Sequence, residues 1–106
     1  MTDTSPSNTI ADDNQEVAIQ AAVFRRLLKH LNDHKEVQNI ELMNIAGFCR
    51  NCFAKWTVDE AEKLGVKIDI ESAKESIYGM PYHEWKAKYQ TPATPEQLAI
   101  FNAKHK

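Results

Sequence analysis

The feature that most constrains this chain is an apolar repeat at three- and four-residue spacing between residues 14 and 35. Phe24, Leu27 and Leu31 fall on one side of a helix with this period, whereas Arg25 and Lys29 fall on the other. Such a division is typical of an amphipathic α-helix that packs one face against a core. We therefore predict a long helix over residues 14–35.

A second long helix is predicted over residues 40–64. Its apolar stripe, plotted at about 100° per residue, consists of Leu42, Ile45, Ala46, Cys49, Phe53, Trp56 and Leu64. Gly65 is expected to end this helix, because glycine adopts the left-handed conformation of a C-terminal cap without strain. Gly47 lies inside the pattern, costs roughly 1 kcal/mol there relative to alanine, and indicates a kink or a close helix contact.

Two short helices are predicted between residues 69 and 90. Asp69 or Ser72 can cap the first, which continues through residue 78 and ends at Gly79. The second carries an aromatic ridge at spacings of three and four residues, formed by Tyr82, Trp85 and Tyr89. This ridge is expected to pack against the two long helices.

A last short helix is predicted over residues 95–104. Thr94 supplies a capping hydroxyl, Pro95 suits the first turn, and the amide of Gln97 can return the cap bond. With only three glycines and four prolines, the chain lacks the turns that a sandwich or barrel would require. The expected fold is all-α, a compact bundle of about five helices, two long and three short.

Composition sets the expected domain organisation and excludes several classes of function. The polar residues 1–13 predict a flexible, disordered tail, and residues 14–106 predict a single helical domain. A net charge of −2 disfavours nucleic-acid binding, and no apolar run approaches the roughly 20 residues that span a membrane. The absence of a signal-like run predicts the cytoplasm. The common enzyme motifs are also absent, so whether the protein is an enzyme stays open.

The cysteines and two histidines have the spacing of a metal site. Cys49 and Cys52 stand at Cys-x-x-Cys spacing, and His30 and His34 stand one helical turn apart. A helical hairpin could bring the four together as tetrahedral ligands of zinc or iron. Alternatively, the cysteines are buried core residues, since free cysteine behaves as a small hydrophobe.

A redox dithiol is the third interpretation of the cysteines. Redox motifs of this spacing are usually activated at the N-terminus of a helix, where the helix dipole favours the thiolate. An uninterrupted helix over residues 40–64 does not provide this position. If Gly47 breaks the helix, Cys49 comes to lie near a new N-terminus and the redox interpretation gains support.

Two runs of sequence resemble a known family. The first is Gly47-Phe48-Cys49-Arg50-Asn51-Cys52, followed by Ala54-Lys55-Trp56, and the second is Tyr78-Gly79-Met80-Pro81-Tyr82, followed by Glu84-Trp85-Lys86. Both are similar to domain of unknown function 1244, a family of short bacterial proteins, over about residues 24–106. The resemblance implies a compact all-helical fold and a bacterial cytoplasmic setting. It implies no reaction and no catalytic residue.

The expected function is that of a non-catalytic protein-interaction module. We infer this from the number of aromatic residues and the lack of catalytic pairs. Its partner would be a second copy, giving a homodimer, or another protein. Phe48, Trp56, Tyr82 and Trp85 are expected to form the core or an apolar interaction surface. If Trp56 lies in the core, its replacement by alanine should cost about 3 to 5 kcal/mol. Metal binding, or a small enzyme that uses the cysteines and histidines, is the alternative.

Overall fold

The computed structural model describes residues 12–104, and these residues form six helices and no strand. The helices are α1 (Asp13–Asp33), α2 (Asn39–Ala46), α3 (Arg50–Lys63), α4 (Ile70–Tyr78), α5 (Tyr82–Tyr89) and α6 (Pro95–Lys104). The all-helical prediction is confirmed. Of the predicted tail, residues 1–11 lie outside the described residues.

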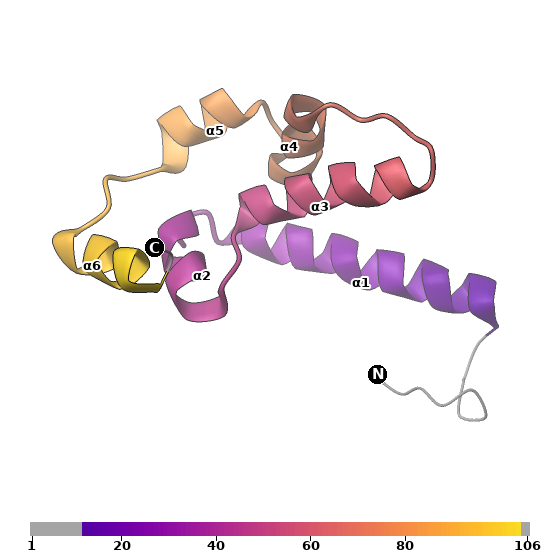
Figure 1. The fold of residues 1–106 in the computed structure, drawn as a ribbon, viewed down its shortest axis with the longest axis horizontal. Helices are drawn as coiled ribbons and strands as arrows, with labels where there is room; N and C mark the ends of the chain where they lie inside the picture. Colours follow the sequence, from indigo (N-terminus) through magenta and orange to yellow (C-terminus); the bar gives the residue numbers. More distant parts are fainter. Residues whose placement is uncertain (1–11, 105–106) are drawn as a thin grey trace. The chain divides into compact units, whose positions relative to one another are not determined.

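The chain divides into two compact units, residues 1–30 and residues 31–106. The described part of the first unit is the amphipathic helix α1 up to His30, with acidic residues in its first turn. The second unit holds the end of α1 and helices α2–α6. Within it, α3 lies against α4, α4 against α5, and α2 against α6 (Figure 1). That residues 14–106 fold as one domain stays a prediction.

The predicted helix over residues 40–64 is wrong in one respect, because it is two helices. Gly47 has a φ of 81°, and its N–H donates to the carbonyls of Leu42 and Met43, which ends α2. Cys49 is extended and forms the N-terminal cap of α3. The glycine therefore does more than kink a continuous helix: it allows the chain to leave one helix and begin another.

This interruption changes which side chains are buried. Because the helix ends at Gly47, the apolar stripe predicted over residues 40–64 does not form one continuous buried face. Ile45 is 87% exposed, Leu64 is 81% exposed and Trp56 is half exposed. Trp56 is therefore not a core residue, and the expected cost of its removal falls accordingly. Phe53 keeps its predicted place in the core.

The core of the second unit lies among α3, α4 and α5. Its buried apolar residues are Cys49, Phe53, Ala54, Ala61, Ala73, Ile77, Tyr78 and Trp85. The Trp85 ring is fully buried, with its centroid 4.8 Å from that of Tyr78 and 5.8 Å from that of Tyr89. The predicted aromatic ridge of α5 thus packs on α4, its chain neighbour, as well as on the side chain of Arg50 in α3.

Local capping accounts for the short helices. Asp69 accepts a hydrogen bond from the backbone N–H of Ser72 at 2.8 Å, as predicted for the start of α4. Gly79, with a φ of 74°, ends the same helix. At the start of α6, Thr94 and Gln97 exchange backbone-to-side-chain hydrogen bonds of 2.9 and 3.1 Å. The predicted bounds of α4 and α6 are therefore confirmed to within a residue or two.

Candidate functional site

A network of polar side chains joins the two sequence runs singled out above. The Tyr78 hydroxyl donates to the carbonyl of the Asn51 side chain at 2.7 Å and accepts from the Asn39 amide at 3.0 Å. The Asn51 amide in turn lies 3.4 Å from the Tyr82 hydroxyl. Tyr78 ends α4 and Tyr82 begins α5, so the tight turn at Gly79 presents both rings to the first turn of α3.

Arg50 anchors this network from within the protein. Its side chain is only 1% exposed, and the guanidinium stacks on Trp85 with its central carbon 5.1 Å from the ring centroid. The guanidinium donates to four oxygens: Val37 O at 2.8 Å, Asn39 Oδ1 at 3.0 Å, His34 O at 3.1 Å and Leu31 O at 3.2 Å. Arg50 therefore fixes the segment between α1 and α2 against the start of α3.

Burial changes the protonation equilibria of two network members. It lowers the pKa of the Arg50 guanidinium, although neighbouring groups act in the opposite direction. It raises the pKa of the Tyr78 hydroxyl, so Tyr78 stays a neutral donor at physiological pH. The network consequently holds one cation surrounded by uncharged hydrogen-bonding groups.

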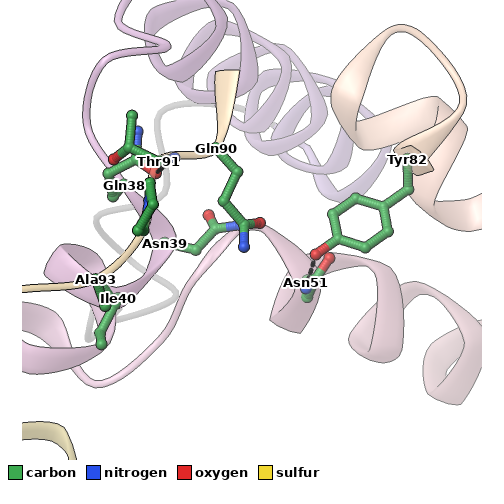
Figure 2. Close-up of a pocket in the computed structure, with 9 residues that line it drawn as sticks. Gln38, Asn39, Ile40, Asn51, Tyr82, Gln90, Thr91 and Ala93 are labelled. Atoms are coloured by element: carbon green, nitrogen blue, oxygen red, sulfur yellow. Dashed lines mark hydrogen bonds between the residues drawn. The ribbon is translucent and has the colours of Figure 1, made fainter. Parts of the chain in front are cut away.

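The network borders a cavity of about 290 Å³, shown in Figure 2. The residues that line it come from the start of α2, the first turn of α3, the start of α5 and the segment between α5 and α6. They are Gln38, Asn39, Ile40, Asn51, Tyr82, Gln90, Thr91, Pro92 and Ala93. This lining contains neither a carboxylate nor an ammonium, guanidinium, imidazole or thiol group. We call it the amide pocket, because carboxamide side chains dominate its polar surface.

Three of the four carboxamides, Gln38, Asn39 and Asn51, have structural roles, and the fourth, Gln90, does not. The Gln38 side chain bridges to the Tyr89 carbonyl at 3.0 Å and to the Thr91 N–H at 2.9 Å, which holds the edge of the pocket in place. By contrast, the exposed Gln90 side chain makes no hydrogen bond within residues 12–104. Figure 2 shows it extending into the space between Asn39 and Tyr82. Gln90 can therefore contact a ligand without losing an existing bond.

The two cysteines occupy the first turn of α3. Cys49 is the N-terminal cap and Cys52 is the third helical residue, and each backbone N–H donates to the sulfur of the other residue. The Cys49 N–H lies 3.4 Å from the Cys52 sulfur. Cys49 is buried and Cys52 is half-buried, and both are free thiols. Burial raises the pKa of the Cys49 thiol above its usual value.

The two histidines predicted as metal ligands are both exposed. His34 lies just beyond the end of α1, with Nδ1 3.4 Å from a carboxylate oxygen of Glu36. His30 belongs to the first unit. Among residues 12–104, no three His, Cys, Asp or Glu side chains are grouped so that they could hold a metal ion. Zinc or iron binding by Cys49, Cys52, His30 and His34 stays a prediction, which elemental analysis of the native protein would test.

The aromatic residues predicted for an interaction surface have different environments. Trp85 is fully buried and so contributes to the core. Tyr82 lines the amide pocket. Phe48 and the half-exposed Trp56 form a cluster with Phe53, with ring centroids 5.3 to 6.1 Å apart. Tyr82, Phe48 and Trp56 are therefore at least partly exposed, and their role in an interaction surface stays a prediction.

Comparison with known proteins identifies the family. The family described as "Protein of unknown function (DUF1244)" matches residues 37–103, which is more than half of the chain. The chain belongs to this family. The match starts after α1, so the DUF1244 region comprises α2–α6 and is shorter than the resemblance over residues 24–106 suggested. A search among curated proteins gave no match.

Sequence reasoning did not single out several residues of this site. Arg50 and Asn51 lie within the first DUF1244 run, but only the cysteines of that run were assigned a chemical role. Asn39 and Gln90 have no recognisable motif, because a lone carboxamide in a loop is common. Arg50 lies inside the helix predicted over residues 40–64, directly after Cys49 of its apolar stripe, and this position was the one available signal of a buried charge. A search of residues 12–104 for membrane-spanning helices found none.

Proposed function

We propose that this DUF1244 protein is a non-catalytic interaction module, and that its amide pocket binds an extended, uncharged segment of a partner protein. The observation that carries the proposal is the lining of the pocket, which consists of uncharged side chains held by the Arg50 network. A buried charge on a ligand would lose its hydration here without gaining an opposite charge. An uncharged ligand avoids that cost.

The polar groups of the pocket match those of a peptide bond. A carboxamide provides both N–H donors and a carbonyl acceptor, and so does each peptide unit of an extended chain. Gln90 is exposed and its amide is not used within residues 12–104. Tyr82 also lines the pocket, and its hydroxyl can donate to a carbonyl.

The segment between α5 and α6 adds a backbone edge to the pocket. Residues 90–94 belong to no helix, and Gln90 is in the extended conformation with φ of −78° and ψ of 129°. The N–H groups of Gln90, Thr91 and Thr94 already donate within the protein and Pro92 has none, so this edge offers its carbonyls and the Ala93 N–H. An extended segment can bind to such an edge, and its alternate side chains then enter a neighbouring pocket. Ile40 and Pro92 supply the apolar contact for such a side chain.

Nuclear magnetic resonance provides a direct test with a defined probe, a blocked alanine tripeptide. We expect saturable changes in the side-chain amide signals of Gln90 and Asn51 as the probe is added. Gln90→Ala and Tyr82→Phe should each weaken binding severalfold, because each removes one polar contact and leaves the core intact. Asn102→Ala is the matched control, since it removes an exposed amide from α6 and should leave binding unchanged.

Two results would overturn the proposal. One is the absence of saturable changes up to tens of millimolar of the peptide. The other is binding that responds equally to Asn102→Ala and Gln90→Ala.

Sedimentation of the protein alone tests the more specific prediction of a homodimer, in which the partner is a second copy. Cytoplasmic location stays a prediction.

A further inference from the structure

The two cysteines form a reciprocal pair at the start of α3 that the proposed binding function does not use. We propose that Cys49 and Cys52 are a redox-active dithiol, which forms an intramolecular disulfide by exchange with low-molecular-weight disulfides. The evidence is the mutual placement of the two sulfurs, their unequal exposure, and their position at a helix N-terminus created by the break at Gly47.

Geometry brings the two sulfurs together. Cys49 and Cys52 accept hydrogen bonds from each other's backbone N–H, and the Cys49 nitrogen lies 3.4 Å from the Cys52 sulfur. Residues at this spacing on a helix have Cα atoms about 5 Å apart, within the range of about 4.4 to 6.8 Å that disulfides adopt. A bond between the sulfurs therefore requires side-chain rotation and no large movement of the backbone.

The two sulfurs differ in exposure, and this difference assigns them different roles in the exchange. Cys52 is half-buried, so a small disulfide can reach it, whereas Cys49 is only 8% exposed. Cys52 is thus the attacking thiol and Cys49 the resolving thiol. The Cys49 N–H donates to the Cys52 sulfur and holds this attacking sulfur at the N-terminus of α3, the positive end of the helix dipole.

The exchange proceeds in two balanced steps. The Cys52 thiolate attacks one sulfur of the small disulfide, forms a mixed disulfide, and releases one small thiol, which takes up the proton that Cys52 lost. The Cys49 sulfur then attacks the Cys52 sulfur, loses its own proton, and displaces the second small thiol. The two protein thiols are oxidised to one disulfide, and the small disulfide is reduced to two thiols.

A dithiol needs fewer groups than a metal site at the same place. Two sulfurs complete a disulfide, whereas a structural tetrahedral metal ion requires four ligands. Residues 12–104 contain no cluster with a third ligand. The ring that the disulfide closes contains Arg50 and Asn51, the two residues that α3 contributes to the polar network.

A glutathione redox titration of the full-length protein tests the proposal. The protein is equilibrated with glutathione and its disulfide in the presence of a chelator, quenched with acid, alkylated and weighed by mass spectrometry. We expect a single transition to a form that has lost two hydrogens and carries no glutathione. Cys49→Ser should instead accumulate a glutathione adduct on Cys52, because the resolving thiol is absent, and Cys52→Ser should form the adduct much more slowly.

Labelling of the unmodified protein gives a second measurement that does not depend on the folding of variants. We expect N-ethylmaleimide to modify Cys52 at least tenfold faster than Cys49 in the native protein, and both equally in urea. Two alkylatable thiols in fully oxidised glutathione would overturn the proposal. Equal labelling rates in the native protein would overturn the assignment of attacking and resolving thiols. Neither measurement involves the peptide probe, so this inference and the proposed function fail separately.

Discussion

Replacement of Arg50 by methionine should destabilise the protein strongly. Methionine keeps most of the aliphatic length that packs on Trp85 but removes the guanidinium. Four oxygen acceptors then lose a charged donor, among them the carbonyls of Leu31 and His34 at the end of α1, which keep only their bonds from the backbone N–H groups of His34 and Val37. Arg50 therefore gives the carbonyls at and just beyond the last turn of α1 a second, charged donor in addition to these backbone bonds.

The expected magnitude follows from the contacts. A hydrogen bond to a charged group contributes about 1.5 to 3 kcal/mol, so four at the lower end amount to about 6 kcal/mol. The stacking of the cation on Trp85 adds up to about 2 kcal/mol. Removing the guanidinium also relieves several kcal/mol of desolvation cost, including that of Nε, which has no partner within the described chain. The net loss is about 3 to 4 kcal/mol.

Urea unfolding followed by circular dichroism measures this loss. The matched control is Arg25→Met, which replaces an exposed arginine of α1 and should change stability by less than about 0.5 kcal/mol. Arg50→Lys should fall between the wild type and Arg50→Met, because one ammonium cannot reach all four oxygens. An Arg50→Met protein within about 1 kcal/mol of the wild type would refute the reasoning, since it would mean that burying the cation costs as much as its bonds contribute.

Two further predictions concern the tryptophans and the cap of α4. Trp85→Ala should cost about 3 to 5 kcal/mol, and Trp56→Ala only about 1 to 2 kcal/mol because its ring is half exposed; equal losses in urea unfolding would contradict this. The hydrogen bonds from Ser72 lower the pKa of Asp69 below its ordinary value of 3.8. The stabilisation by the Asp69 charge is therefore present above pH 3.8 and disappears as the pH falls through the lower, folded-state pKa. Asp69→Asn keeps an acceptor without the charge, so its stability relative to the wild type should rise on acidification; a constant difference between pH 2 and pH 6 would contradict the assignment.

Several elements could be predicted because their signals are local. Asp69 caps α4 through a residue only three positions away, and Thr94 and Gln97 do the same for α6. Gly79 ends α4 because its own backbone conformation is easy for glycine alone. Such interactions depend on neighbouring residues in the chain, so the sequence is sufficient to find them.

The break at Gly47 shows where the periodicity of apolar residues misleads. A stripe over residues 40–64 is compatible with one helix, and the glycine alone does not decide between a kink and a stop. The stop became visible only from the hydrogen bonds of Gly47 and from the reciprocal bonds of the two cysteines. The pattern therefore predicted helices correctly and their number incorrectly.

The sequence by itself determined an all-helical chain, the ends of its short helices, and membership of the DUF1244 family. Only the tertiary structure decided the candidate site. Tyr78 and Asn51 are 27 residues apart, and Gln38 and Thr91 are 53 apart, yet both pairs are hydrogen-bonded. The physical reason is that these contacts depend on how helices pack, and no local spacing encodes which carboxamide meets which tyrosine. The same packing buried Arg50 and left Trp56 half exposed.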